Sequence, residues 1–157
     1  MEIGIISDIH GHLSDAAEQA LQGCDHILCA GDSERPSVLD HLENIAPTTA
    51  VLGNCDYYGD FAARNVPAVA CPVLGGVRFK MVHRPADVGH VPEDVQVVVH
   101  GHTHIPRDEV IAGVRWINPG SATRPRGDSV RSVVRMRVEE GRVVDVRFVP
   151  IHRPLRS

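Results

Sequence analysis

The sequence predicts a single mixed α/β domain in which two sheets pack against each other between helices. Three observations support this fold class. The chain has 157 residues, which is the usual size of one domain. Apolar runs of strand length alternate with amphipathic stretches in its first part, and two later runs contain a central turn. No linker rich in proline, glycine or serine interrupts the chain, so we expect one domain over residues 1–157.

The first part of the chain predicts a β-α-β-α-β unit. Each apolar run is short, as in a buried strand, and the stretches between runs place apolar residues on one helical face. Ser14 is a typical helix N-cap, and Gly23 is typical of a helix end. This order predicts parallel strands with right-handed crossovers. The strands are expected at 2–7, 26–31 and 48–54, and the helices at 13–23 and 34–46.

The later part of the chain predicts further strands, which we expect to be antiparallel. Two of its runs turn back at Ala112-Gly113 and at Glu140-Gly141, and such dipeptides are typical of β-hairpins. The strands are expected at 77–83 and 95–101, and the hairpins at 108–120 and 131–151.

The net charge of −4 conceals a basic C-terminal segment. Residues 1–123 hold 7 Lys and Arg against 16 Asp and Glu, whereas residues 124–157 hold 9 Arg against 4 acids. Arg131, Arg135 and Arg137 alternate with apolar residues, which indicates a strand with one solvated face. An anion-binding role is the alternative, with Arg124 or Arg126 contacting the group that leaves during a reaction.

Composition disfavours several protein classes. Three Phe, two Tyr and one Trp are too few for a base-stacking surface, so a nucleic-acid partner is not favoured. The start of the sequence lacks the basic region of a signal peptide, so we expect a cytoplasmic protein with no membrane partner. The cysteines form no CxxC pair, and we expect Cys24, Cys29 and Cys71 to be core thiols.

Polar side chains that can bind metal follow nearly every predicted strand. The carboxyl ends of parallel strands meet at one edge of a sheet, so we expect these side chains to lie close together. In an extended chain residues i and i+2 share a face, which lets paired residues grip a common centre. The seven candidate ligands are Asp8, His10, Asp32, Asn54, His83, His102 and His104.

Seven oxygen and nitrogen donors exceed what one tetrahedral zinc ion needs, and they suit two divalent ions. Carboxylate, amide and imidazole ligands without thiolate favour transition metals. We expect manganese first, with iron, zinc, nickel or cobalt as alternatives. Two such ions leave the cluster positively charged, so we expect a small phosphorylated substrate.

Short motifs that bear polar residues follow one another in order along most of the chain. They are SDIHG at 7–11, GD at 31–32, GNCD at 53–56, His83, GHTH at 101–104, NPGS at 118–121 and PR at 125–126. This ordered set resembles the motifs of the calcineurin-like metallophosphoesterases, and within that family it is similar to small bacterial and archaeal phosphodiesterases related to the retromer scaffold subunit. The resemblance implies a four-layer α-β-β-α sandwich of two mixed sheets flanked by helices.

The resemblance also implies a metal-dependent phosphoesterase, in the first place a phosphodiesterase. A hydroxide bridging two ions would attack phosphorus in line with the leaving oxygen. Asn54 and His102 would stabilise charge on the phosphoryl oxygens as catalytic residues. The implied ligands are Asp8, His10, Asp32 and His104 for one metal, and Asp32 as the bridge with Asn54, His83 and His102 for the other.

Two positions depart from the family pattern. Cys55 stands where many relatives have a histidine, and a thiol is a poor general acid for the leaving group. Arg84 follows His83 where relatives usually have glycine. We expect Cys55 to contact substrate, and Arg84 either to contact substrate or to point outward into solvent.

Other functions stay open at this point. A protein-binding scaffold of the retromer-subunit type with little catalysis is one alternative, although the related scaffold lacks key ligands that this chain retains. A nuclease or a phosphomonoesterase is another, and a nuclease predicts binding that falls steeply with salt. The sequence is also compatible with a homo-oligomer.

Overall fold

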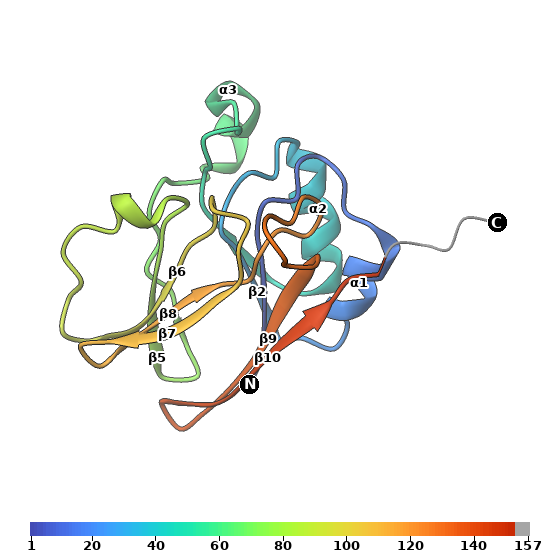
Figure 1. The fold of residues 1–157 in the computed structure, drawn as a ribbon. Helices are drawn as coiled ribbons and strands as arrows, with labels where there is room; N and C mark the ends of the chain where they lie inside the picture. The colour runs from blue at the N-terminus through green and yellow to red at the C-terminus, as the bar shows by residue number, and fades with distance from the viewer. Residues whose placement is uncertain (153–157) are drawn as a thin grey trace.

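A computed structural model describes residues 1–152 as a single α/β domain with two mixed sheets and few helices (Figure 1). The first sheet has the strand order β10-β9-β1-β2-β3, and the second has the order β4-β5-β6-β8-β7. The first sheet contains β1 (Glu2–Ile6), β2 (His26–Cys29), β3 (Thr48–Ala50), β9 (Ser132–Glu139) and β10 (Arg142–Pro150). The second contains β4 (Val73–Leu74), β5 (Val77–Met81), β6 (Val95–Val99), β7 (Arg107–Ile111) and β8 (Val114–Asn118).

The predicted β-α-β-α-β unit is confirmed, because β1, β2 and β3 are parallel neighbours. The Ser14 side chain caps α1 by accepting a hydrogen bond of 3.1 Å from the backbone N–H of Ala17. Gly23 follows the end of α1 with a left-handed φ of 79°. Pro36 opens α2, where the missing N–H costs no hydrogen bond. The helices are α1 (Asp15–Leu21), α2 (Pro36–Ile45) and α3 (Tyr58–Phe61), with 3-10 turns at Ala62–Arg64 and Pro85–Asp87.

The expectation of an antiparallel second part is wrong for the centre of the second sheet. Strands β5, β6 and β8 are parallel, and only β4 and β7 run antiparallel to their neighbours. Both predicted hairpins are present, with left-handed φ values at Ala112, Gly113, Glu140 and Gly141. A turn motif identifies the two strands of a hairpin, but it does not say which of the two pairs with the next strand of the sheet. Here β8 pairs with β6, and β7 forms the edge.

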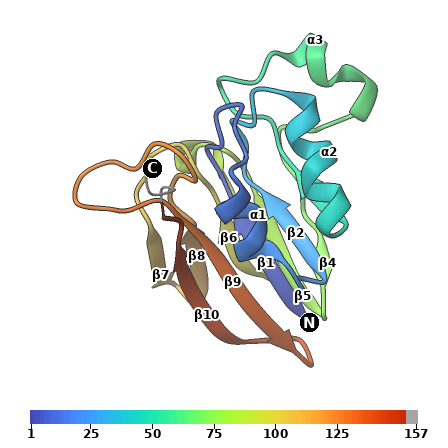
Figure 2. The same cartoon turned by 90° about the vertical axis from the view of Figure 1, so that its right-hand side faces the viewer.

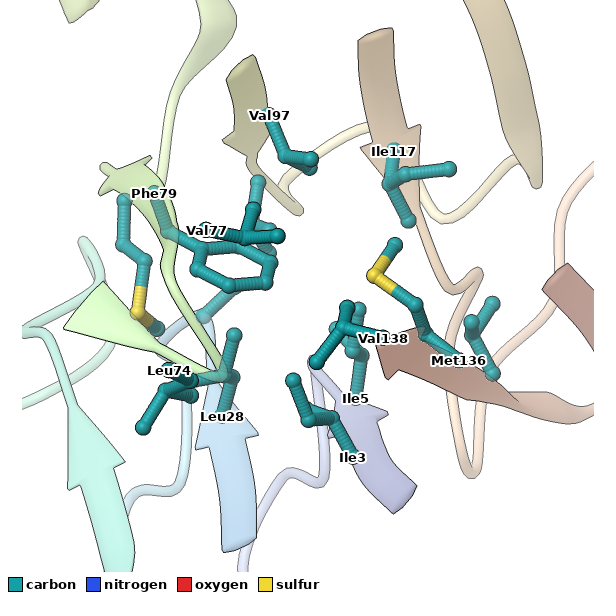
Figure 3. Packing of buried hydrophobic residues seen from close by; sticks show 14 of the residues in the cluster. Ile3, Ile5, Leu28, Leu74, Val77, Phe79, Val97, Ile117, Met136 and Val138 are labelled. Atoms are coloured by element: carbon teal, nitrogen blue, oxygen red, sulfur yellow. The ribbon is translucent and has the colours of Figure 1, made fainter. Parts of the chain in front are cut away.

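The main core lies between the two sheets (Figure 3). Figure 3 shows side chains of the second sheet, such as Phe79 and Val97, facing those of the first, such as Ile5, Leu28 and Met136. All five are fully buried. Burial of aliphatic and aromatic side chains on both inner faces stabilises the stacked pair of sheets.

The two outer faces are covered differently. Helices α1 and α2 lie along the outer face of the first sheet (Figures 1 and 2), where Leu21 and Leu42 pack in one cluster with Ile27. On the outer face of the second sheet, Val88 and Trp116 pack in a smaller cluster beside the 3-10 turn Pro85–Asp87. The predicted architecture therefore holds, with a loop and one 3-10 turn as the covering of the second sheet. None of the described helices has the length and apolar character needed to cross a membrane.

The basic C-terminal segment forms a strand with one solvated face along β9. Met136 points into the core, while Arg135 on the other face contacts Glu2 through Nε at 3.1 Å. Arg147 on β10 donates to the same Glu2 carboxylate at 2.7 Å. Arg137 lies 3.4 Å from Glu139. These ion pairs explain Arg135, Arg137 and Arg147 without an anionic ligand.

The expectation for the cysteines is correct for Cys24 and Cys29, which are buried free thiols. It is wrong for Cys71, which is exposed. This residue lies just before β4, a two-residue strand at the edge of the second sheet, where few neighbours are available to cover it.

Candidate metal centre

The candidate centre lies where strands of both sheets end. Beyond β1 and β2 the two loops stay paired, with Asp8 N–H donating to Gly31 O at 3.0 Å and His10 N–H donating to Asp32 O at 2.9 Å. The backbone N–H of His102, after β6 of the other sheet, donates to the Asp8 carboxylate at 3.1 Å. The Asp8 carboxylate therefore joins the two sheets at the site.

Most of the candidate ligands have a left-handed backbone. The φ values are 54° for Asp8, 51° for His10, 56° for Asp32, 73° for His102 and 62° for His104. The expectation that these residues alternate along an extended chain is therefore wrong in its geometry, although the paired residues do meet. Non-glycine residues rarely adopt this conformation, and it costs on the order of 1–3 kcal/mol at each position. Surrounding hydrogen bonds must hold these loops in place.

Asp8, His10 and His104 form the first donor group. Asp8 Oδ1 lies 3.2 Å from His104 Nε2 and 4.0 Å from His10 Nε2. His10 Nδ1 lies 2.8 Å from the Glu34 carboxylate, and His104 Nδ1 lies 2.6 Å from the carbonyl oxygen of Arg124. Both acceptors require a hydrogen on Nδ1, so each neutral ring presents an Nε2 lone pair. These two Nε2 atoms face each other at 3.2 Å, an arrangement that a shared cation stabilises.

Asp8, Asp32 and His83 form the second donor group, and all three are buried. His83 Nε2 lies 3.1 Å from Asp32 Oδ2 and 3.8 Å from Asp8 Oδ1. The other ring nitrogen, Nδ1, donates to Ala30 O at 2.8 Å. Asp8 Oδ1 and His83 Nε2 have no hydrogen-bond partner among the described residues. Such unpartnered buried atoms are costly unless an ion satisfies them.

Electrostatics at the second group favour charged forms. Burial works against ionisation of Asp32, but the neighbouring His83 ring and the N–H of Cys55 lower its pKa to about 2. Burial also opposes a charge on His83, yet the contact with Asp32 leaves its pKa raised. A carboxylate this readily ionised is a strong ligand for a divalent cation, which would take the place of the proton on His83.

Asn54 and His102 lie on the open side of these groups. His102 Nδ1 is 3.1 Å from Asn54 Oδ1, and its ring packs edge-on against His83 with centroids 5.3 Å apart. Burial lowers the pKa of His102, and the charges of His83 and Arg84 lower it further. His102 is therefore neutral at physiological pH and able to bind a metal ion or accept a hydrogen bond.

Cys55 and Arg84 both reach the mouth of the site. Cys55 is exposed, and its Sγ forms a third donor group with atoms of His10 and Asp32. Burial and the charge of Asp32 raise the pKa of Cys55, so the thiol stays protonated near neutral pH. Arg84 lines a hollow of about 410 Å³ that also borders Asn54.

All seven residues predicted from the sequence as ligands therefore gather at one place. The resemblance assigns the bridging position to Asp32. In the structure Asp8, His10 and Asp32 each belong to two of the three donor groups, so Asp32 is one of three shared residues.

Sequence reasoning missed two acidic residues that organise the site. Glu34 orients His10, as described above. The Asp56 carboxylate accepts backbone hydrogen bonds from Asp32 at 2.9 Å, Gly53 at 2.8 Å and Glu34 at 2.7 Å. The GNCD motif contains Asp56, and an aspartate that bonds nearby backbone groups is typical of such turns, so this signal was available.

Two serines hold Asp8 in position, and of these the sequence singles out only Ser121, as a cap in the NPGS motif. Ser7 Oγ donates to Asp8 Oδ2 at 2.7 Å, and Ser121 Oγ donates to Asp8 O at 2.8 Å. Ser121 belongs to the NPGS motif, in the connection between β8 and β9. Figure 2 shows this orange connection at the same end of the molecule as the blue loop after β1.

Glycines of the motifs give the ligands room. A Cβ atom at Gly53 would lie 2.1 Å from Asp32 Oδ1, and one at Gly101 would lie 2.1 Å from Ser7 Oγ and 2.6 Å from Asp8 Oδ2. All three distances are far below van der Waals contact. The glycines before Asn54 and His102 are thus needed for close packing against the two carboxylates.

Comparison with known proteins identifies relatives over most of the chain. Residues 1–141 match the family model described as the calcineurin-like phosphoesterase superfamily domain. A probable metallophosphoesterase of Bacillus subtilis is 32% identical, with 94% of this chain and 90% of the relative covered. The phosphodiesterase YfcE of Escherichia coli is 30% identical, with 84% of this chain and 85% of the relative covered.

Solved structures share the fold. The phosphoesterase YfcE of E. coli superposes with a TM-score of 0.71 at 24% identity, covering 97% of this chain and all of that one. A Vps29 variant of Entamoeba histolytica gives a TM-score of 0.73 at 19% identity, with the same coverage of both chains. At these identities the structural likeness is evidence for the fold alone.

Proposed function

Because the chain belongs to the calcineurin-like phosphoesterase superfamily, we propose that it is a metal-dependent phosphodiesterase acting on a small phosphorylated substrate. The observation that carries this proposal is the set of buried lone pairs around Asp8. The Nε2 atoms of His10, His83 and His104 all point at carboxylate oxygens while their Nδ1 hydrogens are used elsewhere. A divalent cation between the rings and the carboxylates satisfies such an arrangement.

The donor set fits two divalent transition-metal ions. Oxygen and imidazole ligands suit manganese, and also iron, zinc, nickel or cobalt. When bound, such ions lower the pKa of water and polarise phosphoryl oxygens. The residues that would hold them are Asp8, His10, Asp32 and His104 on one side, and Asp32, Asn54, His83 and His102 on the other.

Residues on the open side of the centre bind and orient the substrate. Asn54 borders both a hollow of about 390 Å³ and the hollow of about 410 Å³ that contains Arg84. A phosphoryl group beside Asn54 and His102 would have its two ester arms directed into these hollows. Asn54 and neutral His102 stabilise charge on the phosphoryl oxygens, and Arg84 adds a positive charge at the rim.

The chain supplies only a weak proton donor for the leaving group. Cys55 lies next to Asn54, and burial and Asp32 raise its thiol pKa. A group that releases its proton so reluctantly assists poorly in protonating an alkoxide. We therefore expect esters with good leaving groups to be hydrolysed fastest. The phosphodiesterase name of the E. coli relative supports diesters as the substrate class.

The test is hydrolysis of aryl and alkyl phosphate mono- and diesters with added manganese. Asp32→Asn should lose at least about a hundredfold of turnover, because a neutral amide is a poor metal ligand and Asp32 belongs to two of the three donor groups. Asp60→Asn on exposed α3 is the matched control and should retain wild-type turnover. Unchanged turnover in Asp32→Asn, or hydrolysis of none of the esters by the wild type, would refute the proposal. The latter result would favour the scaffold alternative.

A further inference from the structure

Two arginines at the mouth of the site have no partner of their own. Arg124 and Arg126 are exposed and line the hollow of about 390 Å³ together with His10, His102 and His104. Among residues 1–152 neither side chain makes an ion pair or a hydrogen bond. Most other arginines of this part of the chain are paired with acids, as at Glu2, Asp94, Asp108 and Glu109.

The backbone that carries these arginines is fixed against the metal centre. The carbonyl oxygen of Arg124 accepts from His104 Nδ1 at 2.6 Å, and its N–H donates to Ser121 Oγ at 2.8 Å. The N–H of Arg126 donates to His104 O at 3.4 Å, and Thr123 Oγ1 donates to Asp8 O at 3.2 Å. The backbone hydrogen bonds therefore fix the Cα atoms of both arginines beside the donor groups, while the exposed guanidinium groups can still move toward a ligand.

The hollow on the other side of Asn54 has a different character. Leu52, Val69 and Val82 line it, with Arg84 at its edge. An apolar ester arm fits this hollow, whereas the hollow with Arg124 and Arg126 suits an anionic arm. Guanidinium groups form bidentate hydrogen bonds with phosphate and carboxylate, and such charged hydrogen bonds are about twice as strong as those between neutral groups.

The surrounding charge favours a small substrate over a polynucleotide. Residues 1–123 carry a net charge of −9, and Arg135, Arg137 and Arg147 of the basic segment are already paired with acids. Among residues 1–152, no lysine or further arginine lines the hollow with Arg124 and Arg126, so the hollow offers no extended basic track for a phosphate backbone.

We infer that Arg124 and Arg126 form a subsite for a second anionic group, a phosphate or a carboxylate, carried by one ester arm of the substrate. The inference rests on the proposed function and names the substrate class of that site: a phosphodiester with one anionic and one apolar arm.

The experiment compares p-nitrophenyl diesters that differ only in their second arm. This arm is ethyl, 2-carboxyethyl or 2-phosphoethyl, and the aryl leaving group fits the apolar hollow. With manganese present, kcat/KM for an anionic arm should exceed that for the ethyl arm by about tenfold, the effect of one or two charged hydrogen bonds. The larger of the two ratios identifies phosphate or carboxylate as the preferred group.

The variants isolate the subsite. In the double variant Arg124→Gln, Arg126→Gln the ratio of anionic to ethyl diester should fall to about one. Arg131→Gln, which changes an unpaired arginine of the same segment that lies in a different hollow, should keep the wild-type ratio. The ratio in wild type should also shrink as salt is added, because exposed charges are screened.

The outcomes separate the inference from the function on which it rests. A wild-type ratio near one, or a high ratio that survives in the double variant, overturns the inference while the diesterase function stands. Hydrolysis of none of the three diesters overturns the function and the inference together. Stronger inhibition by a single-stranded oligonucleotide than by inorganic diphosphate overturns the inference in favour of a polynucleotide substrate.

Discussion

Glu34 offers a direct test of how the protein prepares a metal ligand. Its carboxylate lies 2.8 Å from His10 Nδ1, and this contact keeps the ring in the tautomer with a lone pair on Nε2. Glu34→Gln preserves the shape and an acceptor oxygen but removes the charge. Loss of such an outer partner typically weakens metal binding by about 10–100-fold.

The structure places the expected effect at the lower end of that range. The Glu34 side chain is 33% exposed, so solvent screens its charge, while His10 is only 5% exposed. We expect about tenfold weaker manganese binding, which corresponds to about 1.4 kcal/mol. With metal in excess over both dissociation constants, the variant should lose that amount of metal-dependent stability. For a chain of this length Tm should then fall by about 3–6 °C.

The assay is calorimetric titration of the metal-free protein with manganese, followed by thermal unfolding with and without metal. Glu43→Gln is the matched control. Glu43 is an exposed residue of α2 that forms an ion pair with Arg64, so this substitution should leave metal affinity unchanged. Equal manganese affinity in the two variants would refute the reasoning. The reasoning would also be refuted if Glu34→Gln lowered Tm by the same amount without metal as with metal, since that result assigns Glu34 to folding alone.

Three further changes have defined outcomes. Gly53→Ala should abolish tight manganese binding in calorimetry and destabilise the protein by about 1–3 kcal/mol in urea unfolding, while Gly59→Ala, which meets only the exposed Tyr57 ring, should do neither. Cys55→His should raise the hydrolysis rate of alkyl diesters relative to aryl diesters, because imidazole is a better proton donor, and equal rates for both proteins on an alkyl ester would contradict this. Burial lowers the pKa of His26 below its ordinary value of about 6.5, so the unfolded chain binds the proton more tightly. The contribution of neutral His26 to the free energy of unfolding is present above pH 6.5 and is lost as pH falls through the lowered pKa. In urea unfolding, the free energy of unfolding of His26→Gln should therefore fall less steeply with decreasing pH than that of the wild type. Parallel pH profiles of the two proteins would exclude this role.

The sequence predicts every strand except the short edge strand β4, and it predicts both hairpins and the gathering of the ligands, because each depends on a local pattern. The short apolar runs, the cap at Ser14 and the glycine turn at Ala112-Gly113 all act over a few residues. The ordered motifs then place Asp8 and His104 at one edge, since strand ends converge there. These parts of the fold needed no knowledge of distant contacts.

The remaining features depend on contacts that no local pattern specifies. Pairing of β8 with β6 is a choice between two strands of one hairpin, and both have suitable residues. The role of Glu34 arises from loops that meet in space, because this acidic side chain alone reads as an ordinary surface residue. The left-handed backbone at His10 follows from the same loop contacts, which override the usual preference of a non-glycine residue.

The position of β1 has a consequence for how the protein is made. This first strand pairs with β2 on one side and on the other with β9, which is synthesised more than a hundred residues later. Ser121 and Thr123, which hold the carbonyl of Asp8, also come late in the chain. A ribosome-bound nascent chain that ends before Ser121 therefore lacks the β9 partner of β1 and both hydroxyl groups that hold the Asp8 carbonyl. The capacity to take up metal should appear abruptly, once the C-terminal hairpin has emerged from the exit tunnel.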